Sequence, residues 1–233
     1  MILVTGAAGK TGRAVIRALT TKGEAVRALV HRPEQIQLVE ALGAQQVVVG
    51  DMRFQATMDQ AAQGVRAVYH ICPNVSPDEV AIGQVAITAA RLAGVKHFVY
   101  HSVLHPQVEA MPHHWQKLRV EEQLFESGLS CTILQPAAYM QNVLAHWDQI
   151  IEQGVYPVPY AVETRLGMVD LEDVAEAAAV VLTEPGHAEA IYELAGAEAL
   201  SQVEVATILG QQLGRPVRAE VVSLETWERR ARE

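Results

Sequence analysis

Three glycines near the start of the chain have a spacing that suits a phosphate-binding turn. They lie in the segment VTGAAGKTG (residues 4–12), between a short apolar run and an amphipathic one. A turn without β-carbons lets a pyrophosphate approach the backbone, and a helix that starts beyond it offers N–H groups and its positive dipole end. The pattern predicts a dinucleotide-binding site, whose residues here are Gly6, Gly9, Lys10, Thr11 and Gly12.

An ordinary glycine-containing turn is the alternative, because Gly-x-x-Gly alone is weak evidence. The surroundings favour the dinucleotide site. A strand is expected over residues 2–5, a helix from about Lys10, and a second strand over 25–30. This order of strand, turn, helix and strand is the context that such a site requires.

The end of the second expected strand indicates which dinucleotide binds. An NAD site usually carries a carboxylate there, which bonds the ribose 2′-hydroxyl. This chain instead has Arg32, in the segment LVHRP, and an arginine can form a charge-assisted pair with a 2′-phosphate. Lys10 and Arg13 could add positive charge. We therefore favour NADP(H) over NAD(H); the alternative for Arg32 is a solvated loop arginine.

The elements that must position these residues alternate along the chain. Apolar, strand-like runs cover residues 2–5, 25–30, 46–50, 67–71, 97–102 and 131–136, and helical patterns cover 10–22, 34–42, 55–63, 78–94 and 112–127. Repeated strand, helix and strand units imply right-handed crossovers and a parallel sheet covered on both faces. The predicted fold is an α/β, doubly wound parallel sheet of the Rossmann type.

The alternation loosens after residue 136, which predicts two parts. Residues 1–140 are expected to form the NAD(P)-binding Rossmann core, and residues 141–233 a smaller C-terminal α+β substrate lobe, packed on the same domain over the carboxyl edge of the sheet. The lobe is expected to contain a turn-rich segment over 154–159 and elements over 165–185, 191–196, 201–213 and 216–222.

Composition limits the class of protein. The 233 residues carry a formal net charge of -9, which argues against a nonspecific nucleic-acid binder because that function needs a basic face. Cys72 and Cys131 lie far apart in apolar segments and are expected to be reduced thiols. No apolar run reaches the roughly 18 residues of a membrane span, and no signal peptide precedes Ile2. We expect a soluble cytoplasmic protein without a membrane partner, as a monomer or homodimer.

The glycine spacing resembles the short-chain dehydrogenase/reductase superfamily in its extended and atypical branches, and the chain as a whole resembles the NmrA-like family within it. The matching segments are VYHICP (68–73), AARLAGVKHFVYHSV (89–103), SGLSCTILQPAAYMQN (127–142), GMVDLEDVAEAA (167–178) and YELAGAEALSQVEVATILGQQLG (192–214). Relatives include NADPH-dependent quinone and triphenylmethane reductases and NADP(H)-sensing regulators. Members usually continue some tens of residues past the last segment here, so either the C-terminal lobe is shortened or the sequence omits residues.

The resemblance implies further contacts. Those to the cofactor are Asp51 and Met52 on the adenine side, Ile71, Cys72 and Pro73 after the fourth strand, and Ser102, Lys117 and Pro136. Those to a substrate are His113, Tyr139 and Asn142.

The candidate catalytic residues depart from the superfamily pattern, which has a serine after the fifth strand and Tyr-x-x-x-Lys on the next helix. Val103 occupies the serine position, Ser102 lies one residue earlier, and the helix carries His113-x-x-x-Lys117. Lys117 is expected to hold the nicotinamide ribose. His113 shares its helix face and is either a substitute acid or a wall of the substrate pocket; we favour the wall. The histidines match no common zinc pattern, so we predict no metal site.

Two functions of different class remain open. The first is an NAD(P)H-dependent oxidoreductase that reduces quinones or related electron-poor aromatic or carbonyl compounds, in which solvent supplies the proton. The second is a catalytically weak NADP(H)-binding redox sensor. In both, the cofactor turn has the same role, so the fold does not distinguish them.

Overall fold

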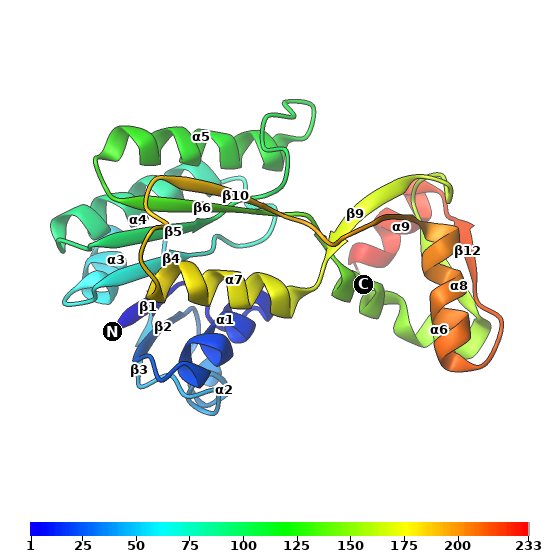
Figure 1. The fold of residues 1–233 in the computed structure, drawn as a ribbon, viewed down its shortest axis with the longest axis horizontal. Helices are drawn as coiled ribbons and strands as arrows, with labels where there is room; N and C mark the ends of the chain where they lie inside the picture. The colour runs from blue at the N-terminus through cyan, green and yellow to red at the C-terminus, as the bar shows by residue number, and fades with distance from the viewer. Residues whose placement is uncertain (233) are drawn as a thin grey trace. The chain divides into compact units, whose positions relative to one another are not determined.

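The computed structural model describes residues 1–232, which form two compact units. The first unit is built on a seven-stranded sheet with the order β10-β6-β5-β4-β1-β2-β3, and every neighbouring pair is parallel (Figure 1). Its strands are β1 (Ile2–Val4), β2 (Val26–Val30), β3 (Gln46–Val49), β4 (Ala67–His70), β5 (His97–His101), β6 (Cys131–Pro136) and β10 (Ala190–Leu194). The predicted doubly wound parallel sheet is confirmed.

Two helical layers cover this sheet (Figure 1). On one face, α4 packs between α3 and α5, and on the other face α1 packs against α7. The bounds are α1 (Lys10–Thr21), α2 (Ile36–Glu40), α3 (Gln55–Ala62), α4 (Glu79–Leu92), α5 (Pro112–Ser127) and α7 (Leu171–Thr183), with a short 3-10 helix, η1 (Pro33–Gln35), before α2. The strand order reverses between β1 and β4, which is where doubly wound sheets bind ligands.

The apolar strands explain why helices pack on both faces of the sheet. All residues of β1, β4 and β6 are buried, so neither face of these strands can be left to water. Phe98, Tyr100 and Ile133 pack in one core cluster with Ala86 and Ala90 of α4. Small side chains on α4 let this helix lie close to the sheet.

The first unit contains residues Met1–Pro136 and Leu171–Leu194, and the second contains Ala137–Asp170 and the chain from Ala195 onward. The predicted C-terminal lobe over residues 141–233 includes residues 171–194. In the structure, β10 instead extends the main sheet beside β6, and α7 covers the sheet next to α1. The chain therefore leaves the first unit after β6 and returns to it.

The second unit has two small sheets. One contains β7 (Ala138–Tyr139), β9 (Arg165–Val169) and β11 (Ala199–Ser201); the other pairs β8 (Val155–Val158) with β12 (Arg218–Val221). Its helices are η2 (Met140–His146), α6 (Trp147–Gln153), α8 (Gln202–Leu213) and α9 (Leu224–Arg232). The expected turn-rich segment forms strand β8, which tolerates Pro157 because it has only one sheet neighbour.

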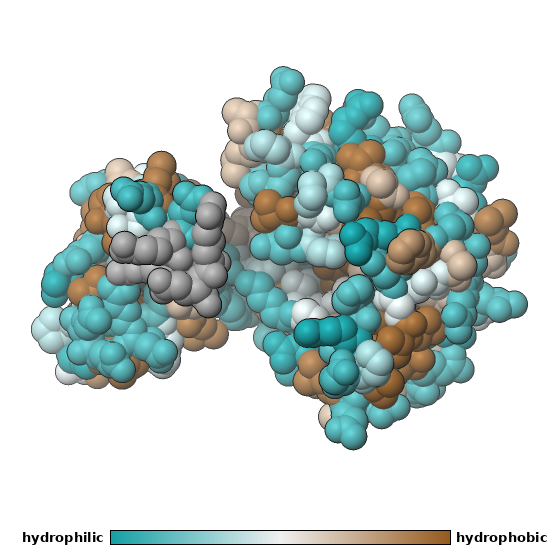
Figure 2. All heavy atoms as spheres, turned by 180° about the vertical axis from the view of Figure 1, so that it is seen from behind, coloured by the Kyte–Doolittle hydropathy of each residue, from teal (hydrophilic) through white to brown (hydrophobic). Residues whose placement is uncertain are grey.

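Hydrophilic side chains cover much of the face of the first unit seen in Figure 2, with apolar side chains scattered between them. Among the described residues, no helix is both long and apolar enough to span a bilayer.

Candidate functional site

The glycine turn is packed so closely that one position excludes any side chain. Gly6 has a φ of +57°, in the left-handed region that favours glycine. A Cβ atom added to Gly12 would lie 2.4 Å from the carbonyl oxygen of Gly6 and 2.7 Å from the Cα of Ala7. These contacts are with backbone atoms, so the helix can approach the turn only if residue 12 is glycine.

The N-terminus of α1 has the properties of an anion site. Gly9 is the N-cap residue and has no side chain to cap the helix, and the first turn contains no acidic residue. The N–H groups and the positive end of the helix dipole therefore face no carboxylate from this turn. Lys10 adds a cation, and partial burial lowers the pKa of its ammonium group.

The loop after β4 is fixed beside the glycine turn. The Thr5 hydroxyl accepts a hydrogen bond from the backbone N–H of Ile71 (2.9 Å) and donates one to the Ile71 carbonyl oxygen (3.1 Å). A Cβ on Gly6 would lie 3.0 Å from that same carbonyl oxygen. Ile71 therefore lies beside the turn, and Cys72 and Pro73 follow it in the chain. Burial raises the pKa of the Cys72 thiol.

The ends of β2 and β3 carry the residues predicted for the adenosine side of the site. Arg32 is exposed directly before η1. Asp51 follows β3. Its Oδ2 accepts hydrogen bonds from two atoms of the Arg53 guanidinium, Nε at 2.9 Å and Nη2 at 2.6 Å. These bonds lower the pKa of Asp51. Met52 packs partly against the main core.

Ser102 follows β5 and is bonded to a buried carboxyl group. Its hydroxyl donates to Glu121 of α5, and the Gln135 side-chain amide lies 3.0 Å from both oxygens of the same carboxyl group. Burial raises the pKa of Glu121. Ser102 and the end of β6 at Pro136 thus lie on adjacent strands, since the Ser102 N–H donates to the Leu134 carbonyl oxygen.

Lys117 of α5 reaches back over the end of β5. Its ammonium donates to Glu79 Oε1 (2.9 Å) and to the carbonyl oxygen of His101 (3.0 Å). The Tyr100 hydroxyl donates to the same Glu79 oxygen at 2.7 Å. Glu79 is the first residue of α4, so three elements meet at its carboxylate.

The two predicted helix residues differ in their surroundings. His113 lies one turn before Lys117 on α5 and makes an edge contact with the ring of His114. Burial, followed by the nearby His114 and Lys117, lowers the pKa of His113. A lowered pKa favours the neutral imidazole at pH 7, and the neutral form is a poor proton donor.

The other two predicted substrate contacts belong to the second unit. Tyr139 ends β7, and Asn142 lies in η2. The residues predicted to contact the cofactor after β1 to β6 therefore all belong to the first unit, whereas Tyr139 and Asn142 belong to the second.

Sequence reasoning missed the buried polar partners of the site, which are Glu79, Tyr100, Glu121 and Gln135. Glu79 has the sequence signature of an acidic residue that merely complements a helix dipole. Glu121 lies four residues after Lys117, a spacing that suggests a pair on one helix face. In the structure Lys117 bonds Glu79 instead, and this pairing depends on where α4 starts relative to α5.

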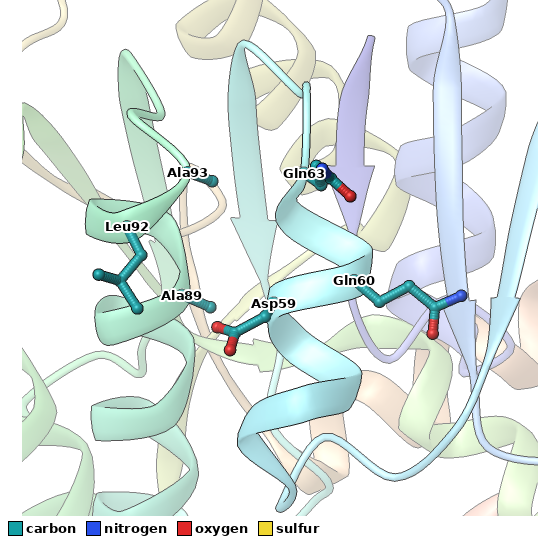
Figure 3. A pocket seen from close by; sticks show the side chains of 6 residues that line it. All are labelled: Asp59, Gln60, Gln63, Ala89, Leu92 and Ala93. Carbon is teal, nitrogen blue, oxygen red and sulfur yellow. The ribbon is translucent and has the colours of Figure 1, made fainter.

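A shallow hollow of about 380 Å³ lies elsewhere, between α3 and α4 (Figure 3). It is lined by Asp59, Gln60, Gln63, Ala89, Leu92 and Ala93. Both helices start near the carboxyl ends of the strands, and these residues lie in their later halves or directly after their ends, toward the opposite edge of the sheet. The hollow is thus remote from the glycine turn. Within residues 1–232, no three His, Cys, Asp or Glu side chains gather as a metal site would require.

The fold and the glycine turn together define an α/β protein of the Rossmann type. More specifically, the chain belongs to the NmrA-like family, whose model matches residues 1–230.

Two curated relatives extend over most of this chain. It is 37% identical over 227 residues to an NAD(P)H azoreductase of Xenophilus azovorans, covering 97% of this chain and 78% of that protein. It is 33% identical over 221 residues to quinone oxidoreductase 2 of Escherichia coli, covering 93% of this chain and 76% of the relative.

Solved structures agree in fold. An NADPH-dependent quinone oxidoreductase of Escherichia coli, complexed with NADPH, superimposes with a TM-score of 0.85 at 32% identity, over 96% of this chain and 79% of that one. The triphenylmethane reductase of Citrobacter sp., complexed with NADP(H), gives a TM-score of 0.86 at 28% identity, over 97% and 80% of the two chains.

Proposed function

We propose that this protein is an NAD(P)H-dependent oxidoreductase that prefers NADPH and reduces quinones or related electron-poor aromatic compounds. The observation that carries the proposal is the glycine turn before α1, where residue 12 must be glycine and the first helical turn carries no carboxylate. Such a site fits the pyrophosphate of a dinucleotide. The relatives named above as azoreductase and quinone oxidoreductase support the choice of substrate class.

Each part of the proposed cofactor site has a separate task. The α1 N-terminus and Lys10 would hold the pyrophosphate, Arg32 a 2′-phosphate, and Lys117 the nicotinamide ribose. An ammonium has three N–H donors, and Lys117 directs two of them to Glu79 and His101, which leaves one for a ribose hydroxyl. When bound, NADPH supplies the hydride.

The residues favour a reaction in which the protein does not donate the proton. Reduction of a quinone to its hydroquinone consumes one hydride and one proton, and solvent can supply the proton. His113 holds its imidazole mainly neutral at pH 7 because burial lowers its pKa. Ser102 donates its hydroxyl hydrogen to Glu121. We therefore propose that His113 is a wall of the substrate pocket.

A turnover assay tests the function. Purified protein is expected to oxidise NADPH in the presence of 1,4-benzoquinone, a naphthoquinone or an azo dye, with one hydroquinone formed per NADPH consumed when the acceptor is a quinone. A sample without protein corrects for direct reaction between NADPH and the acceptor. Tight NADPH binding without turnover on any member of this panel would contradict the proposal and would identify a binding protein instead.

Arg32 gives a test of cofactor preference. Losing a charge-assisted contact to phosphate costs about 1.5–3 kcal/mol. Arg32→Ala should therefore reduce the preference for NADPH over NADH by about ten-fold or more, with little change in NADH affinity. Fluorescence titration with both cofactors measures this, and Arg91→Ala, at an exposed site in the last turn of α4, serves as the matched control. Equal affinities for the two cofactors in the unaltered protein would remove the basis for the preference.

A further inference from the structure

The buried carboxylate of Glu79 has no assigned task in the proposed reaction. We propose that Glu79 is a positioning residue that fixes the Lys117 ammonium at the end of β5, so that Lys117 can bind the nicotinamide ribose of NADPH. This inference rests on the proposed function and adds a residue to its site. Glu79 itself contacts neither cofactor nor substrate in this scheme.

The geometry fixes the ammonium from two sides. Glu79 Oε1 lies 2.9 Å from Lys117 Nζ, and the His101 carbonyl oxygen lies 3.0 Å from the same nitrogen. A lysine side chain has several rotatable bonds, and a single acceptor would leave its ammonium free to move. Two acceptors from different elements, α4 and β5, define one position for it.

The carboxylate is itself held in place. The Tyr100 hydroxyl donates to Glu79 Oε1 at 2.7 Å, and Tyr100 is fully buried within β5. Glu79 is only 3% exposed and begins α4, where the helix dipole favours a negative charge. The ammonium is therefore positioned by a group that is anchored to both the sheet and a helix.

The alternative partner on α5 is engaged elsewhere. Glu121 lies four residues after Lys117, yet its carboxyl group contacts Ser102 and Gln135. Glu79 is the carboxylate bonded to Lys117 among the described residues, so its removal would leave this largely buried ammonium without a directly bonded anion. Removing one partner of a buried ion pair leaves an uncompensated charge, so we expect the Lys117 ammonium to leave this position.

A double-mutant cycle tests whether Glu79 acts through Lys117. Glu79→Gln keeps an oxygen that can accept from Lys117 and Tyr100 but removes the charge. We expect it to raise the Kd for NADPH about ten-fold, and Lys117→Met to raise it by at least as much. The double variant should bind no more weakly than Lys117→Met alone, because an effect transmitted by Lys117 disappears with it. In turnover, Glu79→Gln should raise the KM for NADPH and leave the KM for the quinone unchanged.

A second ion pair provides the control. Lys22 and Glu184 form an exposed pair at 3.1 Å, each after the end of its helix and so at the sheet edge opposite to the glycine turn. Glu184→Gln should leave the Kd for NADPH unchanged. Thermal unfolding establishes that each variant is folded. If Glu79→Gln does not fold, Tyr100→Phe replaces it in the test. This substitution removes one hydrogen bond to the carboxylate but keeps the carboxylate itself, so it should raise the Kd for NADPH by a smaller factor.

Three outcomes would overturn the inference: an unchanged Kd in Glu79→Gln, an unchanged Kd in Lys117→Met, or effects of the two substitutions that add in the double variant. None of these outcomes bears on whether the unaltered protein oxidises NADPH. Absence of NADPH-dependent turnover in the unaltered protein would instead contradict the proposed function, so the two failures are distinguishable.

Discussion

Replacing Gly12 with alanine is expected to raise the Kd for NADPH by about 100-fold or more, which corresponds to roughly 2.7 kcal/mol of binding free energy. The added Cβ would lie 2.4 Å from the Gly6 carbonyl oxygen and 2.7 Å from the Ala7 Cα. Both are backbone atoms, so no side-chain rotation relieves the clash. The turn or the start of α1 must move, and the N–H groups that would meet the pyrophosphate move with it.

Two other glycines show whether the effect is local. A Cβ on Gly9 would lie 3.2 Å from the Gly6 carbonyl oxygen, a contact that a small adjustment relieves, so Gly9→Ala should weaken NADPH binding much less than Gly12→Ala. Gly64 has a φ of +73° and open space around it. Gly64→Ala should lower stability by about 1 kcal/mol through backbone strain while leaving NADPH binding unchanged.

Fluorescence titration with NADPH and thermal unfolding of the same samples measure both quantities. An unchanged Kd in a folded Gly12→Ala protein would remove the basis for the cofactor site.

The sheet was predictable because its information is local. Each strand in the first 136 residues is a short, nearly continuous apolar run, and each following helix has its own pattern, so their alternation specifies a parallel, doubly wound sheet. Strand β10 was not predictable in the same way. Its residues alternate in burial, because it lies at the edge of the sheet, and nothing in the segment AIYEL says which sheet it joins.

The same distinction between local and long-range information applies to the candidate site. The glycine turn could be predicted because its residues are consecutive and each has a backbone task. The Glu79–Lys117 pair could not, because its members are 38 residues apart and meet only when α4 and α5 pack side by side. Single-sequence reasoning identifies residue types that could do chemistry, whereas the partner of a buried charge is a property of the packing.

Acidification is expected to destabilise the protein through two buried histidines. His70 and His101 lie at the ends of β4 and β5, and burial lowers their pKa values to about 4 and about 3. His70 Nδ1 lies 3.0 Å from the Thr5 hydroxyl, and His70 Nε2 is buried without a hydrogen-bond partner among the described residues. His101 Nδ1 lies 2.7 Å from the Tyr69 hydroxyl. In both cases burial disfavours the charged imidazolium.

The direction of the effect follows from proton binding. In the unfolded chain both imidazoles bind a proton near pH 6.5, whereas in the folded protein they bind one only near pH 4 and pH 3. Between these limits the unfolded state holds more protons, so stability is fully present above about pH 6.5 and falls as the pH falls. From pH 7.5 to pH 5 the loss should be about 2 kcal/mol for each histidine. Glu121 opposes this loss in part, because burial raises its pKa and the folded state then binds its proton more tightly.

Urea unfolding at pH 7.5, 6 and 5 measures the loss, and substitution assigns it. His101→Asn keeps a polar atom near the position of Nδ1 but cannot titrate, so it should remove about 2 kcal/mol of the pH-dependent loss, whatever its effect on stability at pH 7.5. His70→Asn should do the same. His105→Asn, at an exposed position, is the control for the substitution itself. If the unaltered protein is equally stable at pH 7.5 and pH 5, or if the His101→Asn and His70→Asn proteins lose as much stability as it does, these histidines are not the groups that the folded state keeps neutral.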